Sequence, residues 1–159
     1  MKFSIIAVGK LKEKYLKEGI AEYSKRLSRF CDLEITEVDD EQAPENLSLA
    51  QEVQIKKKEA YRVHKKVKDG SLVIALDVKG EKLDSTGLAK KLQAFFISGS
   101  SNITFLIGGS LGLDDELVKT AHFRLSLSEL TFPHQMTRLI LLEQLFRCFK
   151  IMNGETYHK

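Results

Sequence analysis

Short apolar runs alternate along the chain with segments whose apolar residues recur every three or four positions. The runs have the length of buried strands, and the recurring spacing is typical of amphipathic helices. Strands are expected at residues 3–8, 33–38, 72–76, 103–107 and 123–127. Helices are expected at residues 15–30, 49–67, 85–98, 114–120 and 134–152.

This alternation predicts an α/β fold with a mostly parallel sheet, because strands that are apolar throughout need helices on both faces. No internal repeat and no Pro/Gly-rich linker interrupts the pattern. A single domain spanning residues 1–159 is therefore expected.

The last helix has apolar residues around most of its circumference. Its polar stripe consists of Glu143, Arg147 and Lys150, which we expect to face water. The other faces predict burial on two sides, against the sheet and against a second subunit. Arg138 projects into the apolar arc of this helix, where a guanidinium requires an anionic partner. It either extends to the rim of the buried region or binds a phosphate or a developing negative charge.

Two loops follow predicted strands. Glycines between Gly108 and Gly112 permit a close approach to a ligand, but a tight structural turn explains them equally well. A dinucleotide-binding loop is disfavoured, because that loop would follow the first strand, where the chain reads Gly9-Lys10-Leu11. The second loop, residues 126–135, lies at a strand's carboxyl end, where open α/β sheets bind ligands. Ordinary helix capping is its alternative role. The two loops would lie close together if the fourth and fifth strands are neighbours.

Charge is distributed unevenly. The net charge is +3, yet residues 30–55 hold eight acidic and no basic side chains, so the rest of the chain has 25 basic against 14 acidic residues. This surplus of +11 permits a polyanionic partner, although a solvated basic face is the simpler explanation.

The positions of the cysteines and histidines indicate which disulfide, metal and proton-transfer sites the chain can form. Cys31 and Cys148 belong to no CxxC pair, which disfavours disulfides and zinc and suits a reducing cytosol. No two histidines have metal-ligand spacing, so no metal is predicted. His64 and His122 are expected at the surface, whereas His134, His158 and Tyr157 are groups that could manage a proton. The first apolar run is too short to span a membrane and has no basic leader, which predicts a cytoplasmic protein.

Four separated segments, together with Arg138, closely resemble the RlmH family. They are Ala7-Val8-Gly9-Lys10-Leu11-Lys12, Phe105-Leu-Ile-Gly-Gly-Ser-Leu-Gly112, Leu125-Ser-Leu-Ser-Glu-Leu-Thr-Phe-Pro-His134 and Tyr157-His158-Lys159. The resemblance covers essentially the whole chain. It implies a SPOUT-class methyltransferase that uses S-adenosylmethionine to methylate N3 of a pseudouridine in 23S ribosomal RNA. It also implies a C-terminal trefoil knot, an exception to the usual unknotted connections, and a homodimer in which one subunit's tail completes the other's site.

The resemblance also implies which residues form the site. The cofactor would be held largely by backbone groups of Leu76, Gly108, Leu127, Ser128, Glu129, Leu130, Thr131 and Phe132. Because the N3-H of pseudouridine is a weak acid, His158 is expected to act as the base, with Tyr157 and Arg138 positioning the uracil or its phosphate. Packing or RNA binding by His158 is the alternative.

RNA contacts are expected from two Lys-rich segments, on an assembled ribosomal surface more than on a free RNA sequence. The segments contribute Lys12, Lys14, Lys17, Lys25 and Arg26, and Lys56, Lys57, Lys58, Lys65, Lys66 and Lys68. The chain departs from the family at Thr137, Cys148, Asn153 and Thr156, and Asn153 replaces an expected basic residue in the tail.

Two other functions remain open. One is a non-catalytic ribosome-binding module with a SPOUT-like fold, which would not bind S-adenosylmethionine. The other is a nucleotide-binding enzyme of ordinary doubly wound fold, which the misplaced glycine loop and the missing ribose-binding carboxylate disfavour.

Overall fold

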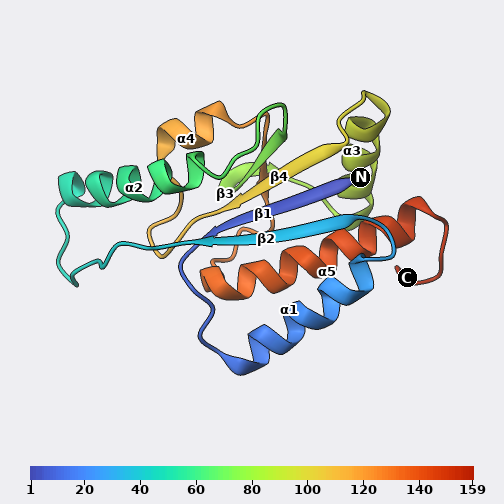
Figure 1. Cartoon of the computed structure of the whole chain (residues 1–159), viewed down its shortest axis with the longest axis horizontal. Coiled ribbons are helices and arrows are strands. Elements are labelled where there is room, and N and C mark those ends of the chain that lie inside the picture. Colours follow the sequence, from blue (N-terminus) through green and yellow to red (C-terminus); the bar gives the residue numbers. More distant parts are fainter.

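A computed structural model describes all residues, 1–159, as one α/β unit (Figure 1). The elements in chain order are β1 (Lys2–Val8), α1 (Lys14–Leu27), β2 (Asp32–Val38), α2 (Leu49–His64), β3 (Leu72–Lys82), α3 (Ser85–Ile97), β4 (Asn102–Ile107), α4 (Asp115–Thr120), β5 (Phe123–Ser126) and α5 (His134–Met152). The predicted strands and helices are therefore all present. The first two helices end three residues earlier than predicted, and β3 continues beyond Leu76.

The five strands form one parallel sheet with the order β2-β1-β4-β3-β5. Alternate residues of β1 point to opposite faces, as the period of a strand requires. Phe3 and Ile5 pack with α1, α3 and α5, whereas Ile6 and Val8 pack with α2 and α4 (Figure 1). Helices cover both faces, which confirms the predicted α/β fold.

β3 is irregular where it meets β5. Leu125 is the register partner of both Leu76 and Glu81, so residues 77–80 bow out between two stretches that contact the same strand. A side chain at Gly80 would place its Cβ 2.8 Å from the carbonyl carbon and oxygen of Arg124. Only glycine allows the two backbones to approach so closely. The C-terminal trefoil knot that the resemblance implies stays a prediction.

α5 lies on the same face as α1 and α3 and packs against both (Figure 1). Leu141, Leu142 and Leu145 are fully buried. The predicted polar stripe is less exposed than expected, since the side chains of Glu143 and Arg147 are only 20% and 25% exposed. The cause is the C-terminal tail, whose Tyr157 packs edge-on against Phe146 with a centroid separation of 5.0 Å.

Candidate active site at the carboxyl edge of the sheet

The predicted cofactor segments follow three consecutive strands of the sheet. Gly108 directly follows β4, Leu76 lies in β3 before the bow, and residues 127–132 follow β5. Because β4, β3 and β5 are adjacent and parallel, these segments lie along one edge of the sheet. The fourth and fifth strands are not neighbours, because β3 pairs with both and lies between them, so the condition under which the two loops would lie close together is not met.

The glycine loop is a tight turn. A Cβ at Gly108 would lie 2.5 Å from the carbonyl carbon of Gly112, and Gly112 has a φ of +83°. The Gly112 N-H donates to the Gly109 carbonyl at 3.0 Å. These glycines are therefore required for the turn itself, whatever the turn binds.

Leu76 and the glycine loop line a cavity of about 500 Å³. Leu111, Gly112 and Leu113 form one wall, and Arg124, which is ion-paired to Asp77 at 2.6 Å, lies on another. This volume is within the usual range for small-molecule sites. The cavity has the size and mixed polar and apolar lining that a nucleoside-type ligand requires.

Residues after β5 line a second cavity of about 450 Å³. Leu127, Ser128 and Phe132 contribute to its wall, together with Gln144 of α5 and His158 of the tail. The backbone here is ordered by its own side chains, because the Ser128 hydroxyl accepts a hydrogen bond from the Leu130 N-H at 3.0 Å.

The remaining residues of this predicted segment, Glu129, Leu130 and Thr131, are exposed, and Glu129 is ion-paired to Lys82. Of the predicted cofactor residues, Gly108 and residues 129–131 line neither cavity, and the others are divided between the two. Leu76 belongs to the first, whereas Leu127, Ser128 and Phe132 belong to the second.

Arg138 is only 2% exposed and lies at the carboxyl end of β1. Its Nη1 donates to the Glu37 carboxylate at 2.5 Å, and its Nη2 donates to the carbonyls of Val8 and Gly9 at 3.2 and 2.7 Å. The buried Nε has no partner. The expected anionic partner is thus a side chain of the protein, and the guanidinium does not reach the rim.

Tyr157 and His158 lie near the other end of α5, beside Arg147. An Arg147 Nη1 is 3.4 Å from His158 Nδ1, and the guanidinium lies 4.8 Å from the centre of the Tyr157 ring. Arg147 is also paired to Glu143 at 2.5 Å. Nine residues of helix, about 13 Å, separate Arg138 from Arg147. Within one chain, the structure brings Tyr157 and His158 together with Arg147 and not with Arg138.

Sequence reasoning assigned Arg147 to a water-facing stripe and so missed its proximity to the tail. The sequence did contain one signal that another segment could contact Arg147. The polar stripe is narrow on a helix that is otherwise apolar. A fold-back of the tail onto that stripe was not predictable from spacing, because the tail has no helical or strand periodicity.

Burial changes the acidity of several groups. Burial, followed by hydrogen bonds with Tyr23 and Glu143, raises the pKa of Tyr157 to about 12. Its hydroxyl therefore stays protonated at neutral pH and donates to Glu143 at 3.3 Å. Burial also raises the thiol pKa of Cys31 to about 11 and that of Cys148 to about 12, so neither thiol is a nucleophile at neutral pH.

The four histidines differ in their surroundings. Burial, followed by the nearby Arg138, lowers the pKa of His134, which lies with Asp40 around the Gly9 turn. His64, His122 and His158 are exposed, as predicted for the first two. His122 nevertheless has a structural contact, since its Nδ1 accepts a hydrogen bond from the Val73 N-H at 2.9 Å.

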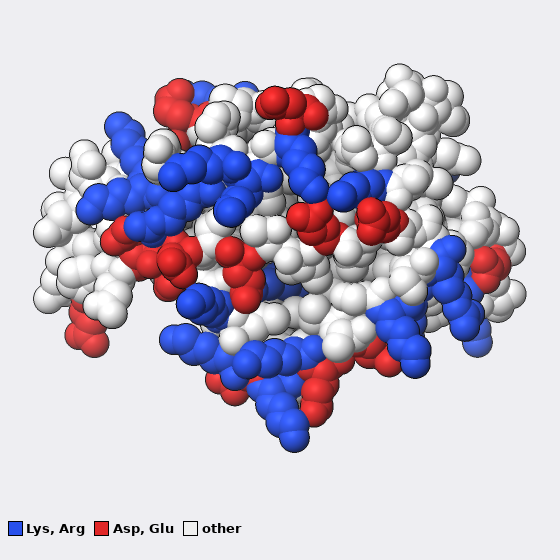
Figure 2. Space-filling view, in the orientation of Figure 1, with Lys and Arg blue, Asp and Glu red and all other residues white.

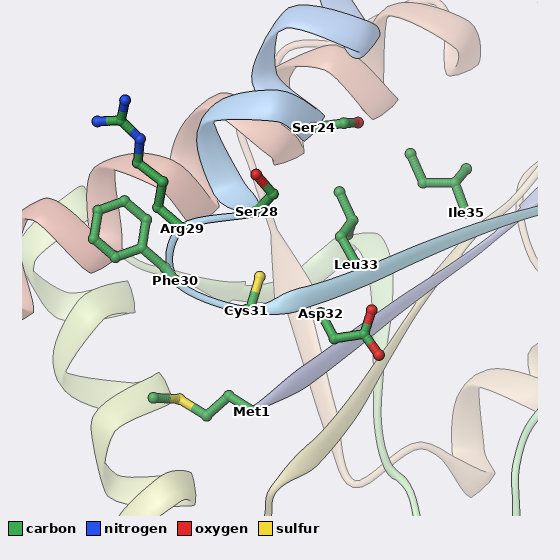
Figure 3. Close-up of a pocket in the computed structure, with 9 residues that line it drawn as sticks. All are labelled: Met1, Ser24, Ser28, Arg29, Phe30, Cys31, Asp32, Leu33 and Ile35. Atoms are coloured by element: carbon green, nitrogen blue, oxygen red, sulfur yellow. The ribbon is translucent and has the colours of Figure 1, made fainter.

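A further surface cavity, of about 810 Å³, lies elsewhere (Figure 3). Met1, Cys31 and Leu33 line it at the amino ends of β1 and β2, and Ser28 and Arg29 line it from the end of α1. It contains none of the predicted site residues. Parallel α/β sheets bind ligands at the opposite edge, so this cavity is a weaker candidate for the active site despite its size.

Two further features bear on the chemistry. No group of three or more His, Cys, Asp or Glu side chains is placed to hold a metal ion. None of the helices combines the length and the apolar composition needed to span a membrane.

Comparisons with known proteins agree with this architecture. Residues 1–158 match the family described as predicted SPOUT methyltransferase. The chain is 66% identical to the ribosomal RNA large subunit methyltransferase H of Acetivibrio thermocellus and 55% identical to that of Clostridioides difficile, each over 159 residues and the full length of both proteins.

Solved structures with little sequence similarity have the same fold. A probable methyltransferase from Bordetella pertussis aligns with a TM-score of 0.55 at 10% identity, covering 92% of this chain and 95% of that one. A probable methylase family protein from Haemophilus influenzae aligns with a TM-score of 0.52 at 15% identity, covering 99% and 70%.

Proposed function

Because the chain belongs to the RlmH family of SPOUT methyltransferases, we propose that it transfers a methyl group from S-adenosylmethionine to N3 of a pseudouridine in large-subunit ribosomal RNA. The observation that carries this proposal is the arrangement of the glycine turn after β4, Leu76 within β3 and residues 127–132 after β5, on three adjacent parallel strands. The names of the full-length relatives support ribosomal RNA as the substrate.

The donor would bind at this edge, between the backbone of the glycine turn and that of residues 127–132. The cavity beside Leu76 is large enough for part of such a ligand, and the exposed residues Glu129 to Thr131 would cover the remainder. When bound, S-adenosylmethionine supplies a methyl group already activated by a positively charged sulfur. The protein therefore needs mainly to align the acceptor nitrogen with that methyl group.

The chain's own residues would manage the proton of the acceptor. The N3-H must be lost before attack, and His158 is exposed, lines the second cavity and can accept that proton. Tyr157 is unsuited as a base, because its raised pKa keeps the hydroxyl protonated. It would instead donate a hydrogen bond and hold the tail against α5.

The cation that acts with His158 would be Arg147. Its guanidinium is partly exposed and contacts the tail, so it can approach a phosphate or the uracil oxygens. The two terminal nitrogens of Arg138 are committed to Glu37 and to the carbonyls of Val8 and Gly9. In this proposal it is a positioning residue that fixes the start of α5 relative to the sheet.

The proposal includes a homodimer in which the tail of one subunit, together with the Arg147 that it contacts, completes the donor site of the other. It also assigns the assembled ribosomal surface as the substrate, in preference to a free RNA sequence. Light scattering tests the dimer, and comparing methylation of intact ribosomes with that of naked RNA tests the substrate.

Mass mapping of ribosomal RNA from cells with and without this protein tests the reaction. Loss of one N3-methylpseudouridine in the deletion strain, and its return on complementation, is the expected result. An unchanged methylation pattern would contradict the proposal. Calorimetry with S-adenosylmethionine tests the competing function, because a non-catalytic ribosome-binding module would bind the ribosome but not the donor.

A further inference from the structure

α1 and α2 are both rich in lysine, but their charges are arranged differently. On α1, Lys14 pairs with Glu18 and Arg26 pairs with Glu22, each one turn apart. Between residues 56 and 68, α2 and the following turn carry seven basic residues and one acid, Glu59. Glu59 is 5% exposed and so neutralises nothing at the surface. The exposed charge of α2 is therefore largely uncompensated.

The exposed side of α2 forms one basic face, which we define by Lys57, Lys58, Tyr61, Arg62, Lys65 and Lys66. Only Arg62 is ion-paired, to Glu41, and the lysines of this face have no acidic partner. Figure 2 shows the resulting concentration of basic side chains over α2. Like charges at this spacing destabilise a helix slightly, and a bound polyanion would relieve that repulsion.

A shallow depression lies on this face. Its volume is about 440 Å³, and it is lined by Lys57, Lys58, Tyr61, Arg62 and Lys65. The Lys65 ammonium lies 4.2 Å from the centre of the Tyr61 ring, which is 64% exposed. A row of cations spaced one helical turn apart can contact successive phosphates of a nucleic-acid strand.

The basic face is connected to the candidate active site. Lys56, adjacent to Lys57 on α2, lines the cavity that also contains Leu76 and the glycine loop. On the opposite flank, Lys65 and Lys66 adjoin Glu37 and Asp39. A strand whose phosphates follow the basic face toward Lys56 therefore reaches the rim of the glycine-loop cavity.

We propose that the basic face of α2 is a docking surface for the phosphodiester backbone of the RNA substrate and directs that strand toward the glycine-loop cavity. This inference rests on the proposed function, because it assigns the substrate contact of the same site. It separates two lysine-rich helices that look alike in the sequence and assigns the docking role to α2.

Two triple variants that remove equal charge test the proposal. The first is Lys57→Gln, Lys58→Gln and Lys65→Gln on α2, and the matched control is Lys14→Gln, Lys17→Gln and Lys25→Gln on α1. Methylation of ribosomal substrate and binding of a ribosomal RNA fragment are measured at several salt concentrations. Thermal unfolding and calorimetry with S-adenosylmethionine verify that both variants fold and bind the donor as the wild type does.

We expect the α2 variant to raise KM by about tenfold at moderate salt, with kcat unchanged at saturation. The slope of log KM against log salt should fall by about 2, since each lost phosphate contact contributes roughly 0.7. The α1 control should stay within about twofold of the wild type. Equal effects of the two triples, or an α2 variant with wild-type KM and salt slope, would overturn the proposal.

Other outcomes are distinguishable. If the α2 variant binds intact ribosomal subunits weakly but binds the RNA fragment like the wild type, the face contacts a protein and the RNA assignment is wrong. If the wild type itself transfers no methyl group, the proposed function fails, and RNA-fragment binding by the two triples still decides whether α2 is the docking face.

Discussion

The two arginines of α5 that contact other segments, Arg138 near its start and Arg147 near its end, have opposite environments. Arg138 is 2% exposed and donates to one carboxylate and two backbone carbonyls. Arg147 is 25% exposed and contacts Glu143, Tyr157 and His158. A guanidinium whose donors are used within the protein holds the structure together, whereas one at a partly open surface remains available to a ligand.

The difference arises from where α5 begins and ends. Its first turn lies against the carboxyl end of β1, where the Gly9 turn brings backbone carbonyls within reach of Arg138. Its last turns also pack into the core, where Phe149 contacts Phe3 and Phe96, and the C-terminal tail covers their polar side through Tyr157. The two ends therefore differ in what surrounds their arginine, which is the carboxyl end of β1 for Arg138 and the tail for Arg147.

Arg138→Ala should have the largest effect on folding. The change leaves Glu37 and two carbonyls without their donor, which we expect to lower the free energy of unfolding by about 3 kcal/mol. Chemical denaturation measures the loss. Arg147→Ala is the matched control and should cost less than about 1 kcal/mol. Similar losses for the two variants would show that the ends do not differ as described.

Arg147→Ala should have the largest effect on catalysis among variants that fold normally. Loss of the cation beside His158 should lower kcat by about a hundredfold, or about 2.7 kcal/mol in the barrier. Single-turnover methylation at saturating substrate measures it, and Arg147→Lys should recover part of the rate. A variant with wild-type kcat and raised KM would reduce Arg147 to a binding contact.

His158→Ala should lower the methylation rate by about tenfold at neutral pH, because solvent can replace a base for a weak acid. The deficit should shrink as pH rises, since the N3-H is lost without help at high pH. A pH-rate profile measures this convergence. A constant deficit across the pH range would indicate that His158 binds or packs and does not accept the proton.

His134→Gln should have the smallest effect of these changes, on the pH dependence of stability. His134 lies near Arg138, at the start of α5. Burial and Arg138 lower its pKa below the unfolded value of about 6.5, so the unfolded chain binds the proton more readily. The stability that this provides is present above pH 6.5 and is lost as pH falls through the folded pKa. Between pH 7 and pH 5, the free energy of unfolding should fall further in the wild type than in His134→Gln, by less than about 1 kcal/mol. Chemical denaturation of both proteins at several pH values measures the difference. An identical pH dependence of the two proteins would contradict the prediction.

The sequence determined the local elements of this protein. The bounds of α5 were predicted as observed, and α3 begins after an N-cap, Asp84, whose side chain accepts a hydrogen bond from the Gly87 N-H. Helical periodicity also placed Arg138 in the apolar arc and required an anionic partner for it. These features depend on residues a few positions apart, which periodicity and capping describe directly.

Only the tertiary structure decided which distant segments meet. Glu37 is 101 residues from Arg138, and β3 lies between β4 and β5 although it precedes both in sequence. The tail's return to Arg147 likewise depends on an aromatic contact with Phe146 that follows no repeat. Strand order and long-range ion pairs arise from the packing of the whole chain, so no local pattern of residues specifies them.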